Sequence, residues 1–310
     1  MVSLPTVPQN GPAQIELFAV PDRVTAGPLP REWEPIVPLR SRIPHSLKVA
    51  LRAGAVTLAA GAAAYLVAPP LVPAVAFAAG AAALAFELSR IKASLSRTLE
   101  DVAADLSQVQ PLLQLDRILP TRRPLPPMTG YAIAPDCALL LAQLVAEEKP
   151  ELILETGSGV STLVLGYALQ RLGRGRVVAL EHEPAYAQKT RALIAQHGLS
   201  AYASVVDAPL EPVMVAGRPY HWYSTRALAG LGRIDLVVDD GPPRIAGRML
   251  RYASLPLLAP RLTARSTFLL DVIAEEEREI LARWREELPM FAQEHLPTKK
   301  GNVIIRRRGR

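Results

Sequence analysis

The sequence is poor in cysteine and in aromatic residues. Only one of its 310 residues is cysteine, and 5% are aromatic. A single cysteine excludes an internal disulfide, and Cys137 has no partner at the spacing of a zinc site. We therefore expect Cys137 to pack in the core, at the start of an apolar helical run over residues 137–145. The chain also lacks a nucleic-acid recognition motif and basic stretches interleaved with aromatic residues, so no nucleic-acid partner is predicted.

Charged residues are absent from one long stretch. Residues 53–86 contain none, and Pro69 and Pro70 break the stretch in the middle. Each half has about 17 residues, near the lower limit for an apolar helix that crosses a membrane. We therefore predict a transmembrane helical hairpin over residues 47–88, with an Ala-rich soluble or interfacial hairpin as the alternative. The stretch begins too far from Met1 to be a signal peptide.

Basic residues flank this stretch on both sides. They are Arg40, Arg42, Lys48 and Arg52 before it, and Arg90, Lys92 and Arg97 after it. The link with the two prolines carries none, so the positive-inside tendency places both ends of the hairpin in the cytoplasm. The net charge of +6, with four arginines among residues 306–310, favours contact with anionic lipid headgroups.

Two further segments surround the hairpin. Residues 1–46 are rich in proline and have little periodicity, which is typical of a disordered or extended tail. Residues 89–124 are expected to form an amphipathic helix, disturbed near its end by Pro111, and then a linker. Its apolar stripe consists of Ile91, Leu95, Leu99, Val102, Leu106, Val109 and Leu113. Such a stripe needs a partner, either a second copy in a homodimer or the C-terminal domain.

The most informative motif is Glu-Thr-Gly-Ser-Gly-Val-Ser-Thr at residues 155–162, which joins an apolar strand to a helix. Gly157 and Gly159 then lie at the carboxyl end of the strand, where glycine allows a tight turn and the close approach of a nucleotide-like ligand. Thr162 stands where the dinucleotide fingerprint has its third glycine, so NAD binding loses support. Glu155 would repel phosphate, and it suits a ligand with a cationic amine or sulfonium, such as S-adenosylmethionine.

Three later strands also end in carboxylates. Residues 176–181 end in Glu181, residues 203–207 in Asp207, and residues 234–240 in Asp240. Ligands of open α/β sheets bind outside the carboxyl ends of the strands, so we expect these acids to converge on one crevice. Glu181 lies about 20 residues beyond the glycines, the position from which an acid accepts hydrogen bonds from ribose hydroxyls.

On these motifs, residues 125–307 resemble a class I S-adenosylmethionine-dependent methyltransferase domain and are similar to its bacterial O-methyltransferase-like branch. The first motif of the family matches residues 155–159, its ribose acid Glu181, its adenine-side acid Asp207 and its fourth motif residues 239–241. The resemblance implies a Rossmann-like, doubly wound α/β fold with a seven-stranded sheet in the order 3-2-1-4-5-7-6, the last strand being antiparallel. Its fifth strand would be residues 267–271, and its final hairpin residues 291–296 and 302–306. It also implies S-adenosyl-L-methionine as the cofactor.

The same resemblance suggests which residues form the site. The expected cofactor-binding residues are Glu155, Gly157, Ser158, Gly159, Ser161, Glu181, His182, Asp207 and Asp240. Asp240 and His221 are the catalytic candidates. The alternatives are that His182 is only a turn residue, that Asp240 only bonds the turn after it, and that His221 only packs in an irregular segment, residues 219–223. Further candidates for contact with the methyl acceptor are Tyr131, Arg244, Trp222 and Tyr223.

A metal is not expected. In relatives that use magnesium, acids after the fourth and fifth strands hold the ion, and these would be Asp240 and Asp271. Val272 occupies the next ligand position, however, and the lysine that some relatives place after the fourth motif is missing.

The sequence thus predicts a methyltransferase anchored in the cytoplasmic membrane, with a catalytic domain over residues 125–310 on the cytosolic side. Its acceptor would be a small molecule, a lipid-linked compound or a glycan, methylated at oxygen. One alternative is an inactive cofactor-binding domain that serves as a membrane-tethered assembly partner. Another is a nicotinamide-dependent oxidoreductase, which would have no antiparallel strand after residue 290.

Overall fold

The computed structural model describes residues 45–67, 70, 72–271 and 275–309. The chain forms two compact units, Met1–Ile91 and Lys92–Arg310. Nearly all of the expected N-terminal tail, and also Val272, lie outside the described residues.

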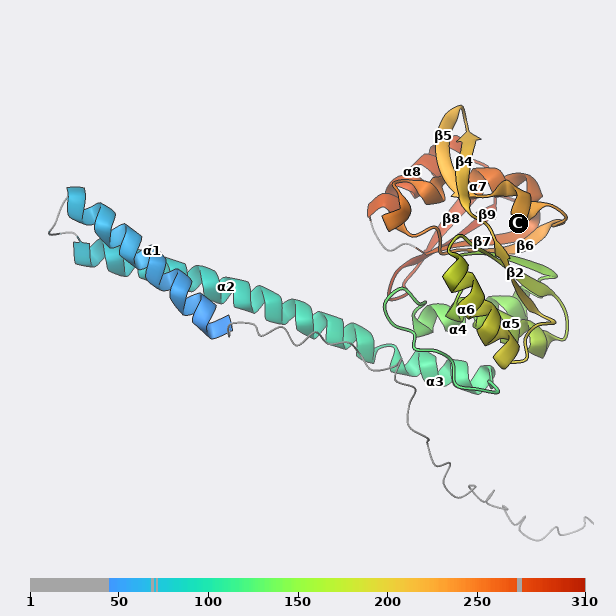
Figure 1. The fold of residues 1–310 in the computed structure, drawn as a ribbon, viewed down its shortest axis with the longest axis horizontal. Coiled ribbons are helices and arrows are strands. Elements are labelled where there is room, and N and C mark those ends of the chain that lie inside the picture. Colours follow the sequence, from blue (N-terminus) through green and yellow to red (C-terminus); the bar gives the residue numbers. More distant parts are fainter. Residues whose placement is uncertain (1–44, 68–69, 71, 272–274, 310) are drawn as a thin grey trace, which may run out of the picture. The chain divides into compact units, whose positions relative to one another are not determined.

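The first unit contains two long helices, α1 (His45–Val67) and the beginning of α2 (Val72–Leu106). Alanine dominates both, and it is the residue that favours helix most. The two helices lie side by side and run in opposite directions (Figure 1). Arg52 Nη1 on α1 lies 3.4 Å from Glu87 Oε1 on α2. The uncharged stretch therefore forms a helical hairpin, as predicted.

Seven strands of the second unit form one mixed sheet. In spatial order they are β3 (Ala203–Asp207), β2 (Arg176–Glu181), β1 (Leu152–Thr156), β6 (Ile234–Asp239), β7 (Leu262–Asp271), β9 (Asn302–Arg307) and β8 (Phe291–Leu296). β9 runs opposite to the other six strands of this sheet, and it pairs antiparallel with both β7 and β8. This confirms the predicted order and the antiparallel last strand. It also contradicts the oxidoreductase alternative, which required that no such strand follow residue 290.

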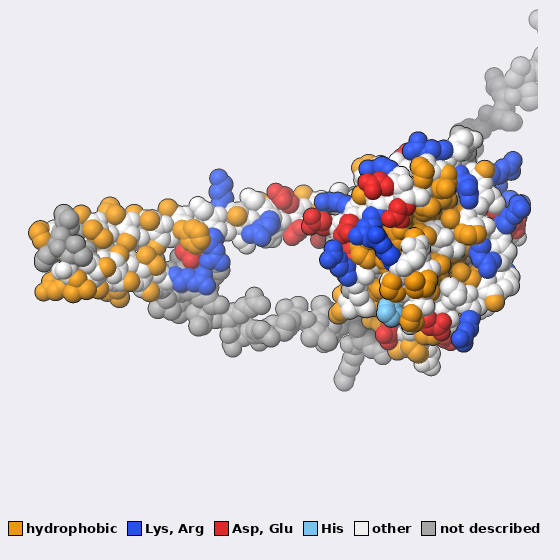
Figure 2. Space-filling model, turned by 90° about the horizontal axis from the view of Figure 1, so that it is seen from above, with side chains coloured by type: hydrophobic (Ala, Val, Ile, Leu, Met, Phe, Trp, Pro, Cys, Tyr) orange, Lys and Arg blue, Asp and Glu red, His pale blue; other side chains and the backbone are white. Residues whose placement is uncertain are grey.

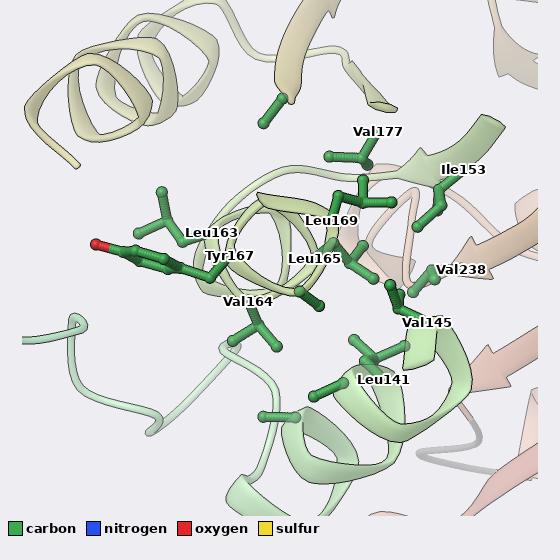
Figure 3. Close-up of a cluster of buried hydrophobic side chains, with 14 of the residues drawn as sticks. Leu141, Val145, Ile153, Leu163, Val164, Leu165, Tyr167, Leu169, Val177 and Val238 are labelled. Carbon is green, nitrogen blue, oxygen red and sulfur yellow. The ribbon is translucent and has the colours of Figure 1, made fainter. Parts of the chain in front are cut away.

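Helices cover both faces of the sheet, so it is doubly wound (Figure 1). The helices of this unit are α3 (Val109–Ile118), α4 (Pro135–Glu148), α5 (Val160–Leu172), α6 (Pro184–Gln196), α7 (Ser254–Leu258) and α8 (Glu275–Glu287), with 3-10 turns η3 (Thr225–Leu228), η4 (Arg244–Ala246), η5 (Leu250–Ala253) and η6 (Ala259–Arg261). On one face, α4 and α5 pack against β1 through side chains such as Leu141, Leu165 and Ile153 (Figure 3). Cys137 is buried in this core, which confirms its expected packing role. On the other face, α7 and α8 form a second core around Phe268 and Trp284.

A two-stranded antiparallel ribbon, β4 (Leu210–Val215) and β5 (Arg218–Tyr223), is inserted between β3 and β6. The prediction of an irregular segment at residues 219–223 was therefore wrong. His221 pairs with Pro212 across the ribbon and is exposed. Trp222 and Tyr223, which follow it, are fully buried.

The predicted amphipathic helix is interrupted earlier than expected. The helix breaks at residues 107–108, between the end of α2 and the start of α3, and Pro111 lies in the first turn of α3. Gln108 explains the position, because its side chain turns inward and exchanges hydrogen bonds with Asp136 of α4 (3.1 and 3.2 Å). The side chains of the stripe are 38–66% exposed, from Ile91 to Leu113.

Candidate functional site

The loops after β1 and β6 lie against each other at the carboxyl end of the sheet. Gly157 has φ = +90°, which only glycine adopts readily, and a Cβ added there would lie 3.7 Å from the carbonyl oxygen of Asp240. A Cβ on Gly241 would lie 3.2 Å from the backbone nitrogen of Gly157. Glycine is therefore required at residue 157 by the backbone conformation and at residue 241 by the close packing of the two loops. Because β1 and β6 are neighbours whose following segments cover opposite faces of the sheet, this is the switch point at which open α/β sheets bind ligands.

Glu181, at the end of β2, holds the loop after β1 in place. Its Oε2 accepts hydrogen bonds from the backbone N–H and the hydroxyl of Ser158 (3.1 and 2.9 Å). Its Oε1 accepts from the backbone N–H groups of His182 and Glu183 (2.9 and 3.1 Å). The four donors occupy the lone pairs of the carboxylate. A ribose hydroxyl would therefore have to replace the hydroxyl of Ser158, the one donor of the four that can rotate away.

Glu155 and Thr162 close the glycine loop onto α5. Thr162 Oγ1 accepts from the backbone N–H of Gly159 (3.0 Å) and donates to Glu155 Oε2 (2.5 Å). Thr162 therefore has a structural reason to stand where a dinucleotide-binding loop has glycine. Burial raises the pKa of Glu155 to about 7, against the effect of hydrogen bonds from Ser161 and Thr162.

The two aspartates after β6 have different surroundings. Asp239 is fully buried, and its Oδ1 accepts from Thr156 Oγ1 (2.5 Å) and Ser254 Oγ (3.0 Å). Burial raises its pKa to about 6. The side chain of Asp240 is 21% exposed and lies 3.5 Å from Arg251 Nη2. Burial raises the pKa of Asp240 to about 8, although the charge of Arg251 lowers it.

Arg251 is a central residue of the site that sequence reasoning missed. Its buried guanidinium donates to the backbone carbonyls of Asp240 (2.9 Å), Asp271 (3.0 Å) and Pro242 (3.3 Å). It also lies 3.9 Å from the carboxylate of Glu277 on α8. One side chain thus fixes the ends of β6 and β7 together. The one available signal was a lone arginine in an otherwise apolar run, residues 249–258.

A second missed contribution comes from the connection between β8 and β9. Asn302 Nδ2 donates to Asp271 Oδ1 (3.2 Å), and Lys300 Nζ donates to the carbonyls of Gly130 (3.1 Å) and Ala132 (2.6 Å). Burial raises the pKa of Asp271, whereas the nearby charges of Arg251 and Lys300 lower it. Lys300 therefore brings a cation to the end of β7 from a loop that is distant in the sequence.

Other predicted residues lie elsewhere or serve the core. Asp207 is 61% exposed and pairs with Arg191 Nη2 at 2.8 Å. Tyr131 is 89% exposed, whereas Trp222 is a core residue whose indole N–H donates to Ser254 (2.9 Å). This corrects the expectation that Trp222 contacts an acceptor. The side chain of Arg244 lies outside the described part of the chain.

His182 lies in the bend after β2, which agrees with the alternative that it is a turn residue. Its Nδ1 is 3.1 Å from Glu181 Oε1. Its role and that of His221 toward a ligand stay predictions. Over the described ranges, no three His, Cys, Asp or Glu side chains gather in a way that could hold a metal ion.

The seven-stranded sheet with its antiparallel β9 and the acids at its strand ends define the class I S-adenosylmethionine-dependent methyltransferase fold. Residues 154–272 match a family model described as a methyltransferase domain. The second unit therefore carries a methyltransferase domain of this class.

Among solved structures, the chain is similar to the methyltransferase PaMTH1 of Podospora anserina bound to S-adenosylhomocysteine, with 18% identity over 68% of this chain and 96% of that one and a TM-score of 0.47. It is also similar to an O-methyltransferase from Bacillus cereus bound to the same ligand (18% identity, 65% and 91% of the two chains, TM-score 0.44). A third is the O-methyltransferase TomG of Streptomyces achromogenes, in complex with S-adenosylmethionine (17% identity, 66% and 90%, TM-score 0.43). None of the curated protein sequences matches the chain.

Proposed function

We propose that the chain is a membrane-anchored S-adenosylmethionine-dependent methyltransferase that acts at an oxygen atom of a small-molecule, lipid-linked or glycan-type acceptor. The observation that carries the proposal is the contact between the glycine loop after β1 and the loop after β6, bordered by Glu181 and Asp240. A Cβ on Gly159 in the first of these loops would meet nothing within 4 Å, so open space faces its backbone, which suits the close approach of an adenosyl ligand. Glu155, Gly157, Ser158, Gly159, Ser161 and Glu181 would hold it.

S-adenosylmethionine supplies a methyl group on a sulfonium sulfur, so the protein needs to hold the acceptor in line and accept its proton. Asp240 is the proposed base. Because burial raises its pKa to about 8, it ionises just above neutral pH, where an acid is well matched to take a proton from a hydroxyl group. Activity should therefore rise with pH up to about 8 and then level off.

The first unit supports membrane anchoring. By length and composition, one helical stretch among the described residues, Val72–Ile118, could cross a membrane (mean hydropathy 1.6). Length and composition alone are weak evidence, because the core helix of a soluble protein has them too. Here, however, large apolar side chains are exposed on both helices, among them Leu66 (85%) and Phe77 (79%). Figure 2 shows hydrophobic side chains spread along this hairpin, with charged side chains gathered at one of its ends.

The charged end of the hairpin suits the boundary between lipid and water. Glu87 is buried between Arg52 and Arg90, at 3.4 and 3.3 Å, so its charge is compensated where α1 and α2 meet. Two arginines around one glutamate leave a positive charge there. This arrangement favours a cytoplasmic surface with anionic headgroups and supports the proposed cytosolic side for the catalytic domain.

Calorimetric titration of the full chain in detergent with S-adenosylmethionine, S-adenosylhomocysteine and NAD tests the proposal. Micromolar binding of both adenosyl ligands but not NAD, weakened in Glu181→Ala, is the expected result. No adenosyl binding by the folded chain would refute the assignment. Asp240→Asn separates an active enzyme from an inactive assembly partner, because only an enzyme would lose methyl transfer while still binding the cofactor.

A further inference from the structure

The hydroxyl group of Tyr223 is a polar group that the site described above leaves unexplained. Tyr223 ends β5, its side chain is fully buried, and its hydroxyl has no hydrogen-bond partner among the described residues. A buried tyrosine hydroxyl normally has a partner, because leaving the hydrogen bond unmade destabilises the protein. Its position therefore points to a group that is supplied from outside the chain.

The hydroxyl lies at the switch point of the sheet. A Cβ built on Gly241 would be 2.3 Å from the hydroxyl oxygen of Tyr223 and 3.2 Å from the backbone nitrogen of Gly157. Gly157 follows β1 and Gly241 follows β6, so the hydroxyl lies beside the two loops of the switch point, where open α/β sheets bind their ligands. It arrives there from the β4–β5 ribbon, an element outside the seven-stranded sheet.

Its electrostatic surroundings make the hydroxyl a donor. Burial, followed by the charges of Glu181 and Asp239, raises the pKa of Tyr223 well above its ordinary value, so the group stays neutral. Glu181 already accepts four hydrogen bonds, and Asp239 Oδ1 accepts from Thr156 and Ser254. Asp239 Oδ2, like the hydroxyl of Tyr223, has no hydrogen-bond partner among the described residues. The O–H of Tyr223 makes no hydrogen bond in the chain alone and is available to an acceptor atom of a ligand bound at the switch point.

We propose that Tyr223 is a cofactor-binding residue whose hydroxyl donates a hydrogen bond to an oxygen atom of bound S-adenosylmethionine. This inference rests on the proposed function and adds to it a contact from the β4–β5 ribbon. Both the ribose and the carboxylate of the methionine part carry oxygen atoms that accept hydrogen bonds, and the experiment distinguishes them.

The experiment compares Tyr223→Phe with Tyr220→Phe in the full chain in detergent. Tyr220 is a matched control, because it lies on the same strand and its ring stacks on Tyr252 with 4.7 Å between centroids. The titrants are S-adenosylhomocysteine and methylthioadenosine, which lacks the amino and carboxyl groups. We expect Tyr223→Phe to weaken binding of S-adenosylhomocysteine about three- to tenfold, the effect of one hydrogen bond, and Tyr220→Phe to leave it unchanged. Equal weakening for both ligands assigns the contact to the ribose, and weakening for S-adenosylhomocysteine alone assigns it to the carboxylate.

Thermal unfolding of the unliganded protein provides the second measurement. Removing a hydroxyl that lacks a partner should leave the Tm of Tyr223→Phe equal to that of the wild type or higher. A lower Tm would overturn the proposal, because it would show that the hydroxyl has a structural partner, such as an enclosed water. Unchanged affinity in Tyr223→Phe would overturn it as well. If the wild type bound neither adenosyl ligand, both the proposed function and the Tyr223 contact would be refuted. If the wild type bound them and Tyr223→Phe bound them equally well, only the Tyr223 contact would be refuted.

Discussion

Replacing Arg251 by methionine should strongly destabilise the second unit. The guanidinium of Arg251 donates to three backbone carbonyls, at the ends of β6 and β7 and in the loop between them, over distances of 2.9–3.3 Å. Methionine keeps the apolar stem but leaves these oxygens without their donors, and it removes a cation from beside Asp240 and Glu277. Removing one partner of a buried charged network costs about 3–5 kcal/mol. For a domain of this size, that corresponds to a fall in Tm of roughly 6–20 °C.

Thermal unfolding followed by tryptophan fluorescence measures this effect, because Trp222 and Trp284 are both buried in the second unit. The matched control is Arg248→Met. The side chain of Arg248 is 77% exposed and pairs with Glu279 at 3.1 Å, so its loss should cost less than about 1 kcal/mol. Arg251→Lys should recover only part of the stability, because lysine keeps the charge but not the planar fork of donors. If Arg251→Met unfolded at the same temperature as Arg248→Met, the central role of the guanidinium would be refuted.

Three further predictions follow from the same structure. Burial raises the pKa of Glu155 from 4.5 to about 7 in the folded state, so its contribution to stability is complete below pH 4.5 and is lost as the pH rises to 7. Relative to Glu155→Gln, the wild type should therefore lose about 3 kcal/mol over this range in urea unfolding, and a constant difference would contradict this. Gly241→Ala should abolish cofactor binding in calorimetry, because its Cβ would meet the hydroxyl of Tyr223 at 2.3 Å, whereas Gly232→Ala, which meets no atom within 4 Å, should bind normally. The double variant Leu58→Asp/Phe77→Asp should move the chain from the membrane pellet to the carbonate-soluble fraction, because each aspartate at a helix centre opposes membrane insertion by about 3 kcal/mol. Retention of this variant in the pellet would argue against a membrane anchor.

The strands that form the sheet could be predicted well, because most are apolar runs with clear ends. The predicted bounds of β2, β3 and β8 are those of the structure. In contrast, β7 begins at Leu262, five residues before its predicted start at residue 267, because a polar segment at residues 263–266 joins the sheet through a register shift against β6. The β4–β5 ribbon was missed because Pro212 and Pro219 lie within its strands, and proline in a run of residues argues against a central strand. A two-stranded ribbon has outer edges on both strands, so it tolerates proline there.

The strand-end acids were predictable for the same reason as the strands, since the sheet alone fixes their positions. Arg251 and Lys300, which connect these ends, could not be predicted, because they come from segments that reach the site only through the tertiary fold. Tyr223 was expected to contact the methyl acceptor, whereas its buried hydroxyl lies beside Gly241 in the loop after β6. The structure also changes the chemical role of one predicted acid. Glu181 was expected to accept hydrogen bonds from the ribose hydroxyls of a ligand. In the chain alone, its lone pairs already accept from the loop after β1 and from the residues that follow Glu181 itself. A sequence motif thus locates the loops at the switch point, whereas the unpartnered O–H of Tyr223 beside them comes from an inserted ribbon that the motif does not include.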